Sequence, residues 1–412
     1  MTADGHHASD ADAPLDVRLA GWATSHRATS EEMALADRSL IDTLAVTAAG
    51  LEHPDAPLAR QLGVGGRIAM LAHLIDYDDL HVPTTTHVSA VCVAAALASG
   101  GGAEAYLAGA GVMARLGSML GWTHYEAGWH ATCTAGAPAA AVVAGLALGL
   151  DSTHLCTAMA LAVPAAGGVN RAFGTAAKSL QVGFAVDAGI RAAMLAAAGA
   201  SADGRVLEQW LTLVGGKPQV LPTTPAIPGG LAAKAYPCCY ALQRPIAAML
   251  DAAGDHMPAA ERVRAITVRA PAVTVSPLIH DRPRTGLEAK FSLQYAIAAV
   301  ILDGAPGLGS FTDRAVGRPA ADRLIGLVEL ELSAGGEDLL AGSVDVDIRH
   351  DSGEQLAASV TLPPGAPGRP LTDAELARKV TDCAGERAAR ELQAAGWPGA
   401  RELIDGWLER GR

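Results

Sequence analysis

Aromatic side chains are scarce in this chain: phenylalanine, tyrosine and tryptophan together make up 4% of its 412 residues. Half of the residues are nevertheless hydrophobic, so small aliphatic side chains must fill the interior. Such a core favours closely packed helices over an aromatic-rich β-sandwich. The chain is also too long for a single hydrophobic core, and we therefore expect two domains.

Positive charge is in deficit as well, because the formal net charge is −12 at pH 7. A negative field repels the phosphates of nucleic acids and of anionic membranes, so neither is an expected partner. The deficit also sets a condition on any anionic substrate. Lysine, arginine and histidine side chains must gather locally to overcome the field of the whole chain.

Paired cysteine motifs are missing too. No CxxC spacing occurs, and the adjacent Cys238 and Cys239 make a poor disulfide framework, so we expect a reduced, cytoplasmic setting. No secretory signal is visible, and the polar residues 1–16 are predicted to be a disordered tail. The uncharged stretch Ala131–Leu150 contains threonines, glycines and a proline, which favour a buried core helix over a membrane span.

The distribution of small apolar residues predicts a large helical domain over residues 1–229. Thr29 and Glu32 form a capping-box pattern, and alanine-rich helical segments separated by glycines follow between residues 88 and 198. Proline-rich and glycine-rich stretches at 222–230 and 363–370 indicate linkers.

Between the linkers the pattern changes to strand-like alternation. Residues 263–268, 344–348 and 356–362 are predicted strands, and Glu288–Leu302 is predicted to be one helix. The predicted fold class is therefore mainly α with an α+β second domain. That second domain would span residues 230–366, and terminal helices at 367–412 would return to the helical domain. A cleft between two such domains is a common place for a ligand.

Acidic residues and histidines gather between residues 76 and 87. Asp78, Asp79, His81 and His87 suit either a metal ion or acid–base chemistry, and a solvated helix end is the structural alternative. His130, among hydroxyl residues ahead of a predicted helix, suits an anion site or a buried, satisfied histidine.

Two further segments carry candidate cations or a thiol. Lys178 follows Arg171 and begins an apolar helix, where a lysine is costly unless it is paired or functional. In the segment Lys234–Cys239, Cys239 would suit a nucleophile, but no neighbour in the sequence activates it, so a tight turn with core thiols is the alternative. No glycine-rich nucleotide loop follows a predicted strand.

The order of these segments resembles that of the MmgE/PrpD family, which includes 2-methylcitrate dehydratase, cis-aconitate decarboxylase and iminodisuccinate epimerase. The resemblance covers about residues 40–304. It is carried by His73–Asp79, His87–Ala90, Gly128–Thr132, Phe173–Leu180, Lys234–Cys239, Glu288–Tyr295 and Leu302–Gly304. The family fold that this implies is a helical domain with an α+β lid, in agreement with the pattern of predicted elements.

The resemblance also implies a set of site residues. It implies catalytic roles for Asp76, His87, His130, Lys178 and Tyr295, and it places Lys234 in the same cleft. We add Arg171 as a further cation and Cys239 as a residue that lines the substrate site. Departures from the family pattern occur at Leu80, Gln181, Cys239, Leu242 and Gln243. They argue against a standard 2-methylcitrate or cis-aconitate substrate.

The expected chemistry is proton abstraction next to a carboxylate, with the resulting carbanion stabilised by positive charge and hydrogen-bond donors. Loss of hydroxide from that carbanion gives a hydro-lyase, which is our first expectation. Reprotonation gives an epimerase or isomerase, and loss of carbon dioxide gives a decarboxylase. A non-catalytic binding protein of the same fold is the remaining alternative. We expect no cofactor and no metal, a small carboxylate as ligand, and a homodimer.

Overall fold

The computed structural model describes residues 13–220, 222–336 and 338–410. Most of the predicted N-terminal tail lies outside the described residues. Its predicted end is wrong, however, because Leu15 and Asp16 are buried in the first turn of helix α1. The predicted capping box is confirmed: the Thr29 side chain accepts a hydrogen bond from the Glu32 backbone, and the Glu32 side chain accepts one from the Thr29 backbone.

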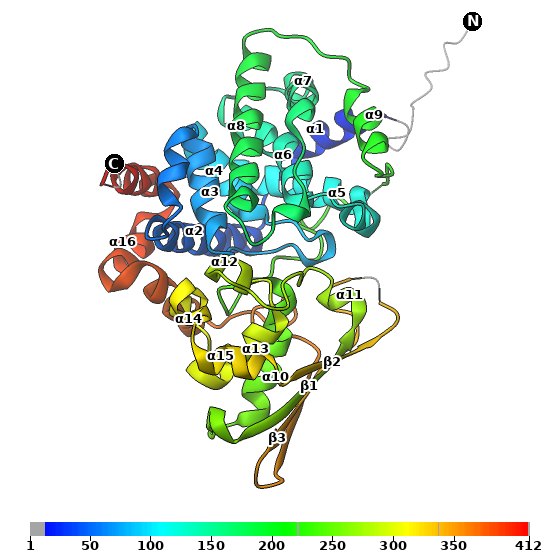
Figure 1. Cartoon of the computed structure of the whole chain (residues 1–412). Coiled ribbons are helices and arrows are strands. Elements are labelled where there is room, and N and C mark those ends of the chain that lie inside the picture. Colours follow the sequence, from blue (N-terminus) through cyan, green and yellow to red (C-terminus); the bar gives the residue numbers. More distant parts are fainter. Residues whose placement is uncertain (1–12, 221, 337, 411–412) are drawn as a thin grey trace, which may run out of the picture.

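The first half of the chain is helical, as predicted, and forms the upper part of Figure 1. Its α-helices are α1 (Leu15–Ser25), α2 (Ser30–Leu51), α3 (Val64–Leu74), α4 (Val88–Ser99), α5 (Ala103–Glu126), α6 (Ala131–Ala147), α7 (Ser152–Ala162), α8 (Ala177–Ala197) and α9 (Val206–Leu213). Small residues allow close approach here: a Cβ added to Gly189 in α8 would lie 2.5 Å from the Ala137 carbonyl oxygen in α6.

Helix α6 contains most of the uncharged stretch Ala131–Leu150, which the sequence predicts to be a core helix. It is buried inside the helical domain, as predicted. By length and composition alone, one helix among the described residues would span a membrane, namely α8. Less than half of its apolar window, 44%, is buried, so α8 also presents a face to the surface. Lys178 lies in its first turn.

The lid region contains a small four-stranded sheet in the order β2-β1-β3-β4. Strand β1 pairs parallel with β2 and antiparallel with β3, and β3 forms a hairpin with β4. Buried valine and isoleucine residues alternate along β1 and β3, so one face of the sheet packs on helices. The elements are α10 (Gln243–Ala253), β1 (Val263–Pro271), α11 (Ala272–Val275), α12 (Gly286–Ala289), α13 (Leu293–Asp303), α14 (Asp313–Val316), α15 (Pro319–Ile325), β2 (Val328–Ser333), β3 (Val344–His350) and β4 (Gln355–Val360).

The predicted fold class is confirmed, and two details of the sequence interpretation are corrected. The expected helix Glu288–Leu302 is interrupted at residues 290–292, between α12 and α13. The Thr285 side chain caps α12, and the Ser292 side chain then caps α13, so the polar residues start two helices. Strand β2 was not predicted, because its burial is one-sided and weak at the edge of the sheet.

The last helical segment, α16 (Asp373–Arg410), is interrupted at Gly385 and Gly396. It leaves the lid and packs against α2, as Figure 1 shows at the left side of the molecule. Lys379 of α16 is buried and forms an ion pair of 2.7 Å with Asp42 of α2. Its ammonium group also donates a hydrogen bond to the Tyr77 carbonyl, 2.8 Å away. The last helix therefore supports the turn that follows α3.

Candidate active site

The turn after α3 carries the carboxylate at the centre of the site. Asp76 adopts a left-handed backbone conformation (φ 53°), which aspartate tolerates better than most residues. Its Oδ1 accepts hydrogen bonds from Lys178 Nζ at 2.8 Å and from Lys234 Nζ at 3.0 Å. Lys234 also donates to the Asp76 carbonyl at 2.9 Å. One carboxylate thus joins α8 of the helical domain to the loop that enters the lid.

Burial alone would raise the pKa of Asp76, but the ammonium groups of Lys178 and Lys234 outweigh burial and hold this pKa far below its ordinary value. Asp76 in turn outweighs the burial of Lys234 and raises the pKa of that lysine. Asp76 and Lys234 are therefore both ionised at neutral pH. The second oxygen of Asp76, Oδ2, is buried without a hydrogen-bond donor among the described residues.

Asp78 holds two histidines beside this group. His73 Nδ1 lies 2.7 Å from Asp78 Oδ2, and His87 Nδ1 lies 3.0 Å from the same oxygen. Lys178 Nζ lies 2.7 Å from His73 Nε2. Since a carboxylate can only accept and an ammonium can only donate, His73 carries its proton on Nδ1 and accepts from Lys178. Asp78, His73 and Lys178 therefore form one hydrogen-bonded chain.

His87 and His130 stand immediately before α4 and α6, and the His87 backbone N–H donates to Thr132 Oγ1 at 3.1 Å. The His73 ring contacts both histidines, with centroid separations of 4.5 Å to His87 and 5.6 Å to His130. The sequence motifs around residues 76, 87, 130, 178 and 234 thus converge in space.

Burial lowers the pKa of His87 to about 3, and burial together with His73 and Lys178 holds the pKa of His130 well below its ordinary value. Both rings are therefore neutral at pH 7. His87 Nδ1 makes no hydrogen bond with the Asp78 carboxylate, but a lone pair on Nδ1 would be repelled by the charge 3.0 Å away, which favours a proton on Nδ1 and a lone pair on Nε2. This geometry suits a general base.

The lid contributes Lys234, Lys290 and Cys239. Lys290 lies in the break between α12 and α13, and its Nζ donates to the Pro237 carbonyl at 2.6 Å. Its own carbonyl accepts from the Cys239 backbone N–H at 3.0 Å. Burial lowers the pKa of Lys290 to about 8, and burial raises the pKa of the Cys239 thiol to about 12. Cys239 is therefore a protonated thiol, which suits lining better than nucleophilic attack.

Two residues of the predicted set are not brought into this cluster. Tyr295 is fully buried in the lid core, and its hydroxyl donates to the Ser310 carbonyl. Arg171 is exposed and lies in a short 3-10 helix, η5 (Asn170–Ala172). The sequence resemblance could align these positions with the family, but it could not show where the side chains point.

The possible metal ligands that meet in the structure differ from those predicted from the sequence. Asp79 is bound to Ser89, and His81 is bound to Thr84 and to the Pro228 carbonyl, so both face away from the cluster. The potential ligand atoms that do meet within 4.8 Å belong to His73, Asp76, Asp78 and His87. A divalent cation there would lie beside the ammonium groups of Lys178 and Lys234, which repel it.

Some neighbours of the cluster were missed by sequence reasoning. His73 and Asp78 appeared in the motif, yet no role was assigned to His73. Gln181, read as a departure from the family pattern, donates to His130 Nδ1 at 2.6 Å. The sequence does contain one indication that Lys290 has a special position, because this lysine stands between two apolar segments. Tyr125 of α5 packs into the lid core together with Phe173, and no pattern in the sequence predicted that contact.

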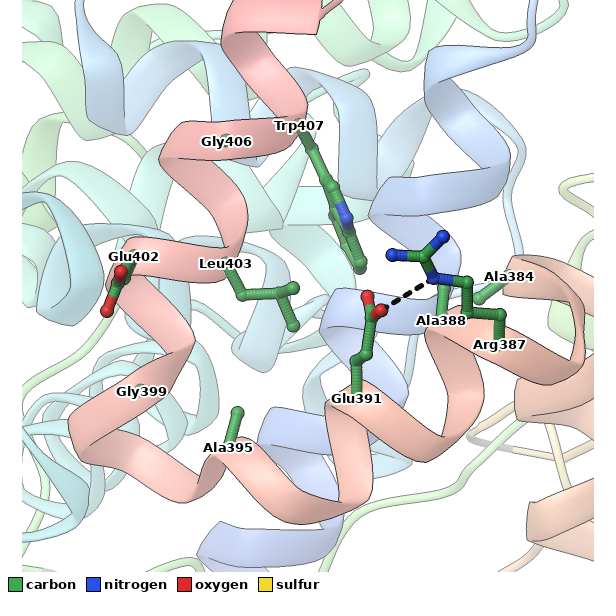
Figure 2. Close-up of a pocket in the computed structure, with 10 residues that line it drawn as sticks. All are labelled: Ala384, Arg387, Ala388, Glu391, Ala395, Gly399, Glu402, Leu403, Gly406 and Trp407. Carbon is green, nitrogen blue, oxygen red and sulfur yellow. Dashed lines mark hydrogen bonds and ion pairs between the residues drawn. The ribbon is translucent and has the colours of Figure 1, made fainter.

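A groove of about 760 Å³ lies away from the candidate site, between the turns of α16 (Figure 2). Arg387 and Glu391, which form an ion pair of 2.9 Å, line it together with alanines, Leu403 and Trp407. None of the candidate site residues lines this groove.

The fold and the site define a class of protein: a helical domain and an α+β lid that share a buried cluster of carboxylates, histidines and lysines. Comparison with known families agrees. The MmgE/PrpD N-terminal domain matches residues 67–214, and the MmgE/PrpD C-terminal domain matches residues 236–396. The chain belongs to the MmgE/PrpD family.

Two curated relatives are cis-aconitate decarboxylases. The protein from Homo sapiens is 30% identical over 226 residues, which is 49% of this chain and 45% of the relative. The protein from Aspergillus terreus is 25% identical over 288 residues, which is 63% of this chain and 58% of the relative. The chain thus matches about half of the length of these relatives.

Proposed function

We propose that this chain is a lyase that removes a proton next to a carboxylate of a small, hydroxylated di- or tricarboxylate. In this proposal, Lys178 and Lys234 bind a substrate carboxylate and stabilise the enediolate-like carbanion. His87 Nε2 accepts the proton from carbon. Elimination of the β-hydroxyl group as water would then complete a dehydration, which needs no electron acceptor.

The observation that carries the proposal is the unsatisfied Oδ2 of Asp76. A buried, ionised carboxylate oxygen without a donor is costly, so a bound ligand that donates a hydrogen bond there gains affinity. A substrate hydroxyl is such a donor. The neighbouring ammonium groups attract the carboxylate of the same molecule. Together they favour a hydroxy acid over a substrate without a hydroxyl group.

A second candidate function is decarboxylation of a cis-aconitate-type substrate, which the names of the curated relatives favour. It passes through a related carbanion, which is then protonated at carbon. Cys239, with a pKa of about 12, is a poor proton donor on the lid side, so this function comes second here. Epimerisation would use the same first step and would return the proton on the opposite face.

The test is a screen of hydroxylated and unsaturated di- and tricarboxylates in deuterated water, followed by NMR. Exchange of a C–H proton for deuterium reports proton abstraction even if net turnover is slow. Loss of water, loss of carbon dioxide or inversion then identifies the reaction. The proposal fails if the purified protein exchanges no proton in any of these compounds and so does not differ from the Lys178→Ala variant.

We also propose a homodimer formed through the exposed face of α8. Phe184, Met194 and Leu195 are between 47% and 60% exposed on this helix, and a second copy of the chain would cover them. Phe184→Asp should shift the sedimentation coefficient to that of a monomer. Leu213→Asp, at an exposed leucine of α9, is the matched control and should leave the dimer intact. A wild-type protein that stays monomeric at all concentrations would contradict the proposal.

A further inference from the structure

Gln181 reaches the Nδ1 atom of His130 from the second turn of α8. Its Nε2 lies 2.6 Å from His130 Nδ1, in the same ring that contacts His73. The amide group is also bound to the backbone of Val169: Oε1 accepts from the Val169 N–H at 3.0 Å, and Nε2 donates to the Val169 carbonyl at 3.2 Å. Three contacts therefore hold one side-chain amide.

The contact with Val169 determines which way the amide points. A backbone N–H can only donate, so the glutamine oxygen must face it. The NH₂ group must then face His130, and it can only donate. A flipped amide would place two donors against each other at the Val169 N–H and two acceptors against each other at the Val169 carbonyl. The orientation is thus set by the backbone, independently of the imidazole ring.

A second donor points at the same nitrogen. Cys133 Sγ lies 3.3 Å from His130 Nδ1, and burial raises the pKa of this thiol far above neutral pH, so it keeps its proton. The backbone at Gly168 brings the two donors together. A Cβ added there would lie 2.9 Å from Cys133 Sγ and 3.2 Å from Gln181 Cδ, at a φ of +118°, so only glycine fits without displacement.

We propose that Gln181 is a positioning residue that holds His130 in its neutral Nε2–H tautomer, so that His130 acts as a hydrogen-bond donor and cannot act as the base. Nδ1 accepts from Gln181, and the remaining ring nitrogen, Nε2, carries the proton. In this proposal His87 has the opposite tautomer, because a lone pair on its Nδ1 would be repelled by the Asp78 carboxylate 3.0 Å away. The two histidines thus have different roles. His87 Nε2 takes the proton from carbon, and the electron pair moves onto the substrate carboxylate. The Nε2–H of His130 donates a hydrogen bond to the resulting negative charge.

This inference rests on the proposed function for its catalytic meaning, but the tautomer can be measured without a substrate. The experiment is ¹⁵N NMR of protein labelled only at histidine, with the His130 signals assigned by their loss in His130→Gln. We expect a protonated Nε2 and an unprotonated Nδ1 at pH 7. A protonated Nδ1 in the wild-type protein would overturn the inference.

Gln181→Glu then tests the positioning role. A carboxylate can only accept, so the proton should appear on His130 Nδ1. Gln209→Glu, the same change at an exposed position of α9, should leave the His130 signals unchanged. If Gln181→Glu also leaves them unchanged, Gln181 does not set the tautomer.

Kinetics provide the second measurement. Gln181→Met keeps the length of the side chain but removes the donor, and it should lower kcat about tenfold with little change in KM. A merely structural role would change the two parameters together or lower the stability alone. If no carboxylate undergoes exchange in the wild-type protein, the proposed function fails, while the NMR result still decides the tautomer.

Discussion

The helical domain and the lid contribute to the site in different ways. In the helical domain, Asp76, Asp78, His73 and Lys178 are linked by direct hydrogen bonds, on elements that are braced by α16. In the lid, Lys234 and Lys290 extend from loops, and both are fixed to backbone carbonyls. Lys234 also donates to Asp76 Oδ1 and so belongs to the preorganised network, whereas Lys290 donates to a carbonyl within the lid itself.

This difference suggests a division of function. In the proposed function, the helical domain would carry the groups that abstract the proton, and Lys234 of the lid would support them through Asp76. The lid would complete the positive charge with Lys234 and Lys290. Substitutions in the helical part should therefore reduce the chemical step, whereas substitutions in the lid should change substrate binding and pH dependence.

The largest effect is expected in the helical domain. Lys178→Ala and His87→Ala should each lower kcat by ~10²-fold or more, because each removes a group that acts on the developing charge or on the proton. Both variants should keep the fold, as measured by circular dichroism. A nearly normal kcat in both would show that the catalytic cleft lies elsewhere.

The pH profile should separate the two regions. His87 acts as a base only when it is neutral, and with a pKa of about 3 it stays neutral down to acid pH, so kcat/KM should be flat between pH 7 and about pH 5. Lys290 is charged below its pKa of about 8 and neutral above it, so kcat/KM should fall as the pH rises through about 8.

Lys290→Arg tests the alkaline limb of that profile. Its guanidinium group stays charged, so the fall in kcat/KM should move to a higher pH. Lys290→Met should lower kcat/KM at pH 7 and remove the alkaline limb. An unchanged limb in both variants would assign it to another group.

Tyr295→Phe should affect stability more than turnover. The hydroxyl donates to the Ser310 carbonyl in the lid core, and its loss leaves that acceptor unsatisfied at a cost of about 1–3 kcal/mol. Chemical denaturation measures this loss. A fall in kcat of ~10²-fold in a stable variant would restore the catalytic role that the family resemblance implied. Cys239→Ser is the control for a residue that only lines the site, and we expect it to have a mild effect on turnover.

The smallest effect is expected from chelation. Prolonged treatment with EDTA should leave kcat within about twofold, because the positive charge of the proposed site comes from lysines. Activity that is abolished by the chelator and restored by Zn²⁺ or Mg²⁺ would instead assign His73, Asp76, Asp78 and His87 to a metal.

The sequence alone determined the fold class and the segments that form the site. Helical periodicity, the capping box at Thr29 and the alternation in β3 are local properties, and local propensity and patterning decide them. Five predicted residues meet in one cluster in the structure, namely Asp76, His87, His130, Lys178 and Lys234. Their order along the chain, matched to a family, was enough to select them.

The tertiary structure decided what each group can do. Tyr295 points into the lid core and Arg171 points to solvent, although both follow the expected pattern of residues. The protonation of His73 and His130 depends on partners that are between 5 and 105 residues away in sequence. Side-chain direction, burial and hydrogen-bond partners arise only when distant segments pack together, so no local pattern could have predicted them.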